Sequence, residues 1–286
     1  MGTKTKTSRA LALSLAVCAT AALPAAAQAT QTIRYRPVPG VHAYHYEVIE
    51  TVNGQPTHAY RTDFDLQVNR DGSIDAIVRS AQESDGKTWS PVKLTDDCLA
   101  KMHAPKGGIA TARIWPTTKD PSAAMGNSFL DLCAPPAVFF PLTDIVNVVV
   151  ISVADAKLPS ELRKPGDTAH FAGFTAHYDR AGEGLTETTH GGVTTLESVD
   201  AKVATLKWAP ALADLDLSEH TAQGQAMKMI GVEHWSFRVE IDRHTGALIR
   251  AKTPYDDLDL TVHMQGLPED KAPKVKIVRV VTIEPR

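Results

Sequence analysis

Apolar and polar residues alternate along most of this chain, and the alternation is clearest in residues 235–255. Phe237, Val239 and Ile241 take every second position, and charged residues stand between them. A period of two places the apolar side chains on one face of a β-strand and the charges on the other. The residues at 242–246, Asp-Arg-His-Thr-Gly, then predict a turn, because glycine adopts a positive φ without a steric clash and aspartate hydrogen-bonds the backbone ahead of it. We therefore predict a β-hairpin here.

The same arrangement recurs earlier in the chain. Residues 64–74 repeat the order of an aromatic, two aliphatics, an Asn or Asp, an Arg, a Gly and an aliphatic. Asn53-Gly54 is the strongest two-residue hairpin signal, and Asp71-Gly72 and Asp85-Gly86 predict further reversals. The expected fold is mainly β: an antiparallel meander that forms a curved sheet, half-barrel, barrel or sandwich, with a few short helices in an insert.

The alternation is interrupted between residues 95 and 141. A short helix beginning at Thr95 is predicted there, followed by loops rich in Gly and Pro and a helical turn at residues 129–133. We favour a surface excursion over a lid or plug for this insert. Residues 159–167 resemble a junction, so the expected organisation is an N-terminal β half at 30–158 and a C-terminal β half at 159–286, with one continuous domain as the alternative.

Two further stretches have their own predictions. Residues 146–153 are apolar and β-branched, which predicts a strand buried on both faces. Residues 214–229 are polar and are predicted to be helical in part.

The N-terminus predicts a secretory signal peptide. Three cations precede an apolar run at residues 10–17, and small residues lead to a cleavage site near Ala29. The apolar core is shorter than the roughly 20 residues that a transmembrane helix needs. We therefore expect a periplasmic or secreted protein that starts near Thr30. A less favoured alternative is an outer-membrane lipoprotein, with Cys18 as the lipidated residue.

Two cysteines remain after this cleavage, Cys98 and Cys133. An even pair in an oxidising compartment favours a disulfide, which in the chain-entropy model stabilises the fold by about 4 kcal/mol. Two metal-binding or catalytic thiols are the alternative, and the sequence shows no neighbouring partners for them.

Charge argues against nucleic acid as a partner. Removing residues 1–29 leaves 27 Lys and Arg against 33 Asp and Glu, a formal charge of −6. The densest basic stretch, residues 271–279, interleaves its charges with strand-forming residues, so we interpret it as the solvent face of a last strand rather than a phosphate-binding surface.

No motif indicates a catalytic, metal or cofactor site. The chain has no G-x-S-x-G, no H-E-x-x-H and no C-x-x-C, and its glycine pairs fall in hairpin turns rather than in phosphate loops. His42 and His45 are expected on opposite faces of a strand. The carboxylates at 256, 257 and 259 are interpreted as a solvated face. An enzyme is therefore the less favoured class, no cofactor and no metal are predicted, and a scattered catalytic set is the form a hydrolase would take.

Aromatic residues on the core-facing positions of strands suggest a ligand site. A wide curved sheet lined by aromatics can hold an apolar ligand, whereas an ordinary packed core is the favoured alternative. The candidate ligand-binding residues are Tyr44, Tyr46, Phe64, Tyr178, Trp235 and Phe237.

The signal peptide, the successive hairpins and the disulfide-sized insert together resemble the periplasmic half-barrels of the LolA type. These lipoprotein carriers are similar in having an open β-sheet that shelters acyl chains, which would imply binding of a lipid or another apolar envelope ligand. The chain is longer than one such domain and shows no apolar helical lid. A structural or interaction module that docks another envelope protein is the alternative function, and a hydrolase the third.

Overall fold

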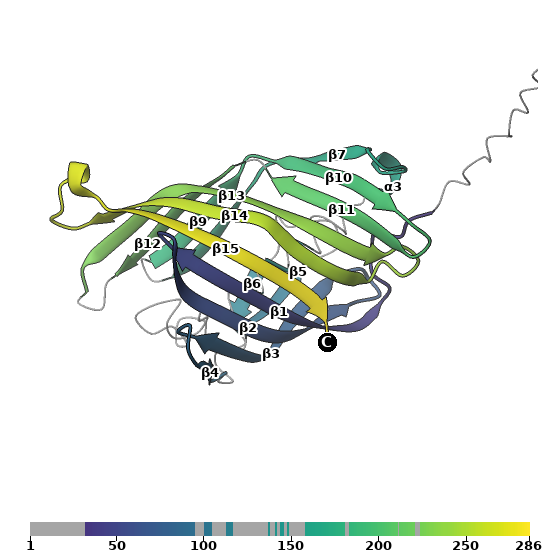
Figure 1. Cartoon of the computed structure of the whole chain (residues 1–286), viewed down its shortest axis with the longest axis horizontal. Helices are drawn as coiled ribbons and strands as arrows, with labels where there is room; N and C mark the ends of the chain where they lie inside the picture. Colours follow the sequence, from purple (N-terminus) through teal and green to yellow (C-terminus); the bar gives the residue numbers. More distant parts are fainter. Residues whose placement is uncertain are drawn as a thin grey trace, which may run out of the picture.

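The computed structural model describes residues 32–94, 100–104, 113–116, 137, 141, 144–145, 148, 158–180, 183–210, 212–220 and 224–286 (Figure 1). Strands dominate these residues, as the alternation predicts. The strands are β1 (Gly40–Val52), β2 (Gln55–Val68), β3 (Ile74–Ser84), β4 (Trp89–Pro91), β5 (Ala100–Ala104), β6 (Arg113–Pro116), β7 (Thr168–Phe171), β8 (Phe174–Arg180), β9 (Glu183–Thr189), β10 (Gly192–Val199), β11 (Val203–Pro210), β12 (Ala213–His220), β13 (Ala226–Asp242), β14 (Leu248–Met264) and β15 (Lys274–Pro285). The short helical elements are α3 (Leu158–Glu161) and η4 (Glu269–Lys271).

These strands form one curved antiparallel sheet, which confirms the predicted fold class. The main path runs β6-β5-β3-β2-β1-β15-β14-β13-β11-β10-β7, and among the described strands it does not close on itself. Strand β13 is shared, since its first half pairs with β12 and its second half with β11. Strands β9 and β8 extend the sheet beyond β12.

The predicted turns lie where the sequence places them. Asn53 and Gly54 have φ of 50° and 78°, as a two-residue hairpin between β1 and β2 requires. Asp242 fixes the turn between β13 and β14, because its Oδ1 accepts hydrogen bonds from the N–H groups of His244 and Thr245 at 2.9 and 2.8 Å. These contacts explain why short polar turn sequences determine the meander.

Three local predictions are wrong. Residues 213–220 and 226–229 form strands instead of a partial helix, because Leu215 and Leu217 alternate with aspartates at a period of two. The helix predicted from residue 95 does not continue through 100–102, which belong to β5. Val148 is helical, although residues 146–153 are predicted as a strand, and the rest of that stretch lies outside the described residues. The helical turn predicted at 129–133 lies outside the described residues.

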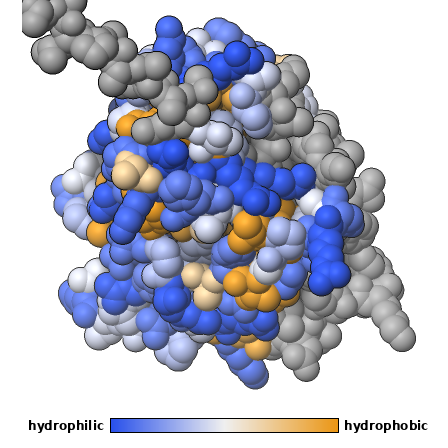
Figure 2. Space-filling model, turned by 90° about the vertical axis from the view of Figure 1, so that its right-hand side faces the viewer, coloured by the Kyte–Doolittle hydropathy of each residue, from blue (hydrophilic) through white to orange (hydrophobic). Residues whose placement is uncertain are grey.

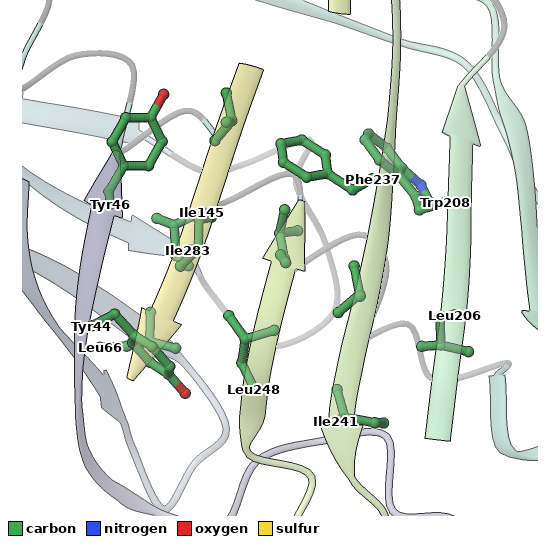
Figure 3. Packing of buried hydrophobic residues seen from close by; sticks show 14 of the residues in the cluster. Tyr44, Tyr46, Leu66, Ile145, Leu206, Trp208, Phe237, Ile241, Leu248 and Ile283 are labelled. Carbon is green, nitrogen blue, oxygen red and sulfur yellow. The ribbon is translucent and has the colours of Figure 1, made fainter. Parts of the chain in front are cut away.

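The interior of the curved sheet holds a continuous hydrophobic core. Figure 3 shows side chains from β1, β15, β14, β13 and β11 pointing into the same space, with Ile145 packed among them. Tyr46, Trp208 and Phe237 are fully buried. Removing a side chain of this size from water contributes roughly 1.5–3 kcal/mol to folding. Ala137 and Val148 belong to the same cluster, so part of the chain between β6 and α3 packs inside the sheet.

The pairing of β1 with β15 brings the first and the last of the described strands together at the centre of the sheet. Their register pairs Tyr46 with Ile283 and Glu50 with Arg279. One sheet therefore runs through both of the predicted halves, and a boundary near residue 158 stays a prediction. No helix among the described residues is long and apolar enough to cross a membrane.

Residues 32–38 precede β1 and lie along the β13–β14 turn. The N–H groups of Arg34 and Val38 donate to the carbonyls of Arg243 and Thr245 at 2.9 and 3.0 Å. Gly246 permits this approach, because a Cβ there would lie 2.3 Å from the carbonyl oxygen of Arg36. This segment closes one end of the core, since Ile33 and Tyr35 are buried in it.

Candidate functional site

The most distinctive feature of the interior is a group of carboxylates around Arg279 on β15. Its guanidinium lies 2.7 Å from Asp144, 3.1 Å from Asp256, 3.7 Å from Glu50 and 3.8 Å from Glu233, each measured from a guanidinium nitrogen to a carboxylate oxygen. The side chains are 5% exposed for Arg279 and between 2% and 12% for the four acids. Charged residues are rarely this deeply buried unless they are paired. Together with Glu187 on β9 we call this set the acidic cluster.

The alternation of the strands explains how these charges reach the interior. Glu50 follows Tyr46 and Val48 at intervals of two, and all three are buried. Arg279 has the same relation to Val281 and Ile283 on β15. Because β1 and β15 are neighbours in register, Glu50 lies directly opposite Arg279 on the same face of the sheet.

Tyr46 links the cluster to the core. Its hydroxyl donates to Asp144 Oδ2 at 2.6 Å and accepts from Arg279 Nη2 at 3.2 Å. Arg279 Nη2 also donates to the same Asp144 oxygen at 2.7 Å. The three groups thus form a closed set of charge-assisted hydrogen bonds, the stronger kind of hydrogen bond in proteins.

Burial raises the pKa values of the acids in the cluster. It raises the pKa of Glu187 to about 7, against the lowering effect of the Thr189 hydroxyl. It raises the pKa of Asp256 to about 6, although the charge of Arg279 opposes the change. The pKa of Glu233 lies well above its usual range, first through burial and then through repulsion from Asp256 and Glu187. Among the described residues one arginine faces five acids and does not neutralise them all, so the pKa values of these acids are raised.

Some polar atoms beside the cluster have no hydrogen-bond partner among the described residues. They include Asp256 Oδ1, Trp235 Nε1 and Ser236 Oγ, all of them buried. Trp235 and Asp256 are cross-strand neighbours on β13 and β14. Buried polar groups are normally hydrogen-bonded, so these atoms mark a place suited to a polar ligand group or to water.

An aromatic wall adjoins the cluster. The rings of Trp208 and Trp235 meet edge to face with centroids 4.3 Å apart, and Phe237 lies 5.8 Å from Trp235. Phe171 stacks on Trp208 with ring centroids 5.4 Å apart. Glu233 and Trp235 are two positions apart on β13, so anionic and aromatic side chains occupy the same region of the interior.

The structure separates the residues predicted to bind a ligand into three places. Tyr44 and Phe64 stack on each other at 5.7 Å, Trp235 and Phe237 belong to the aromatic wall, and Tyr46 joins the acidic cluster. All five are at most 3% exposed. The side chains of Tyr178, Cys98 and Cys133 lie outside the described ones, so the disulfide stays a prediction, as does ligand binding at these aromatics.

Two interpretations of charged residues from the sequence are wrong. Asp256 is 2% exposed and belongs to the interior, whereas the sequence predicts a solvated face for Asp256, Asp257 and Asp259. Arg279 is buried too, although residues 271–279 are interpreted as a solvent face. Lys274 and Lys276 are exposed as expected, but Arg279 stands an odd number of positions further along and therefore points to the other face.

The described residues contain no group of three or more His, Cys, Asp or Glu side chains arranged to hold a metal ion. The acids of the cluster surround the guanidinium of Arg279.

Comparisons with known proteins assign no family. No family model and no curated protein matches the chain. Among solved structures, a mutant porin of Rh. blastica is 8% identical and covers 86% of this chain and 99% of its own, with a TM-score of 0.21. OmpF of Salmonella typhi in complex with daunomycin is 8% identical over 85% and 97%, with a TM-score of 0.24. A putative AttH of Nitrosomonas europaea is 8% identical over 83% and 92%, with a TM-score of 0.14. These TM-scores are too low to support a functional argument.

The resemblance to LolA-type carriers is wrong: the solved structures named above to which the chain is similar include porins and no such carrier. A signal peptide and short hairpin turns are common to antiparallel sheet proteins in general. They determine neither the number of strands nor their order, and here β1 and β15 meet in the middle of a much larger sheet.

Proposed function

We propose that this protein is an exported protein of the cell envelope whose curved sheet binds an amphiphilic ligand bearing a positive charge. The observation that carries the proposal is the imbalance of the acidic cluster, in which, among the residues that the structure describes, five buried acids accompany one arginine. Export rests on the predicted signal peptide. Ligand binding rests on the interior, as follows.

Buried charge must be neutralised. An ionised carboxylate in a low-dielectric interior is costly unless it is paired or protonated. Arg279, the cation of the cluster within the described part of the chain, offsets one negative charge, so the remaining acids either bind protons or pair with a second cation. A ligand with an ammonium or guanidinium group would provide that cation and would release protons from Glu187, Glu233 and Asp256 as it binds.

The aromatic wall supports an amphiphile over a simple inorganic cation. Trp208 and Trp235 offer π faces and apolar surface within the same interior region as Glu233. A cation placed over an indole ring gains roughly 0.5–2 kcal/mol, and an apolar tail would gain more from burial. Because these side chains are buried, we expect binding to be slow and to follow local opening of the fold rather than diffusion.

Tryptophan fluorescence tests the proposal directly. Purified protein is titrated with decyltrimethylammonium, decanoate and decanol, which share the tail and differ in charge. We expect saturable quenching with the cationic compound, at least tenfold tighter than with the other two. Equal responses to all three, or no saturable response, would contradict the proposal.

A matched pair of variants on β13 locates the site. Glu233→Gln removes an inward acid that can ionise when a cation binds next to the aromatic wall, whereas Glu240→Gln removes an outward charge paired with Arg250 at 2.9 Å. Glu233→Gln should weaken binding of the cation about tenfold and leave decanol unaffected, since only the charge changes. Glu240→Gln should change neither.

A second candidate is docking of another envelope protein on the outer face of the sheet. Ile49 and Val280 are cross-strand neighbours on that face and are 47% and 55% exposed. Exposed apolar side chains on adjacent strands suit a protein interface. Replacing both with lysine should abolish a specific crosslink formed in the cell envelope; an unchanged crosslink would exclude this face.

A further inference from the structure

A cavity of about 470 Å³ lies at one end of the molecule, and arginines line it, in contrast to the acids of the acidic cluster. Its lining includes Ile33, Arg34, Arg36, Pro159, Arg243 and His244. These residues come from the segment before β1, from α3 and from the turn after β13. Figure 2 faces the end of the molecule where these elements lie, and hydrophilic residues there surround separate hydrophobic patches.

The framework of the cavity is held by backbone contacts. Arg34 donates its N–H to the carbonyl of Arg243 at 2.9 Å, and the Tyr35 hydroxyl donates to the carbonyl of Leu162 at 2.6 Å. The Arg243 guanidinium donates to the carbonyl of Asp200 at 3.0 Å. These hydrogen bonds to backbone carbonyls fix the segments that carry the cationic side chains around the cavity.

Two of the arginines have no carboxylate partner among the residues that the structure describes. Arg34 Nε donates to the carbonyl of Arg36 at 3.2 Å, and Arg36 Nη2 donates to the carbonyl of Gly72. Arg36 Nε is buried and has no hydrogen-bond acceptor. The aspartate nearest in sequence to the turn, Asp242, has its Oδ1 engaged by backbone N–H groups. The described lining of the cavity thus contains three arginines and no carboxylate, although Asp200 and Asp242 interact electrostatically with Arg243 and His244 nearby.

We propose that this cavity binds a phosphate group carried on a small apolar moiety. Guanidinium groups donate paired N–H bonds that match phosphate oxygens, and a phosphate carries more negative charge to offset several cations than a carboxylate does. Ile33 and Pro159 provide apolar surface for the attached moiety. This site is separate from the acidic cluster and does not depend on the proposed function.

Isothermal titration calorimetry at constant ionic strength tests the site, with inorganic phosphate, phenyl phosphate and benzoate as probes. We expect saturable binding of phenyl phosphate, with weaker binding of inorganic phosphate and at least tenfold weaker binding of benzoate. Arg34→Gln should weaken phenyl phosphate binding about tenfold or more, because a charge-assisted hydrogen bond is lost. The control Arg79→Gln removes an exposed arginine of β3 that pairs with Asp65 and should have no effect.

Flotation with vesicles containing phosphatidic acid distinguishes the source of the phosphate. Saturable binding of soluble phosphates, with no flotation of the protein on the vesicles, identifies a soluble ligand. Flotation of the protein that Arg34→Gln abolishes identifies a lipid headgroup. Either result supports a phosphate site. Absence of both, equal binding of benzoate and phenyl phosphate, or equal loss in Arg34→Gln and Arg79→Gln would overturn the proposal. Thermal unfolding of the unliganded variants verifies that they are folded.

Discussion

Replacement of Arg279 by methionine should be among the most destabilising single changes in the sheet interior. The substitution keeps an unbranched apolar side chain of similar length but removes the cation that contacts Asp144, Asp256, Glu50 and Glu233. Removing one partner of a buried ion pair typically costs about 3–5 kcal/mol, because the other charge stays buried and uncompensated. Domains are stable by only about 5–15 kcal/mol, so this loss is a large share of the total.

Urea unfolding at pH 7, followed by tryptophan fluorescence, measures the effect. The control is Arg79→Met, which removes an arginine side chain that is 51% exposed and should cost less than about 1 kcal/mol. The loss in Arg279→Met should become smaller at pH 5, where the acids of the cluster bind protons and repel each other less. Equal losses in the two variants at pH 7, or a larger loss at pH 5, would refute the role of Arg279 as the charge that permits burial of these acids.

Two further predictions concern the interior and the turns. The free energy of unfolding should rise as the pH falls from about 7.5 to 5.5. Glu187 and Asp256 have pKa values of about 7 and 6 in the folded protein, so they bind protons in this range before the unfolded chain does. Urea titrations that show falling stability over this range would contradict the assignment. Gly246→Ala should lower the free energy of unfolding by roughly 2–3 kcal/mol and Gly54→Ala by only about 1 kcal/mol. Both glycines have a positive φ, but only the Cβ added at Gly246 would meet backbone atoms, those of Arg36. Equal shifts in thermal unfolding would show that residues 32–38 do not dock on the turn.

Much of the meander could be predicted from the sequence, since its turns depend on local chemistry. Asn53-Gly54 adopts the two positive φ values that its hairpin needs, and Asp242 caps its own turn. The order of the strands could not be predicted. Alternation shows which face of a strand is buried, but nothing in it shows that β1 pairs with β15 across more than 200 residues.

The acidic cluster was in part accessible to sequence reasoning. Glu50, Glu233 and Arg279 all stand at positions whose neighbours two residues away are buried aromatic or aliphatic side chains. A charge at a core-facing position is therefore the signal that could have identified them. Asp144 carries no such signal, because it lies outside the strands and reaches Arg279 from 135 positions away in the sequence.

The central position of β15 has a consequence for how the protein is made. Synthesis proceeds from the N-terminus, so Glu50, Glu187, Glu233 and Asp256 leave the ribosome before Arg279. Until the last strand arrives, β1 and β14 lack their common neighbour and the acids lack their cation. The nascent chain therefore cannot complete its core before β15 has been made, and a chain truncated before β15 would keep both sheet edges open to pairing with other chains.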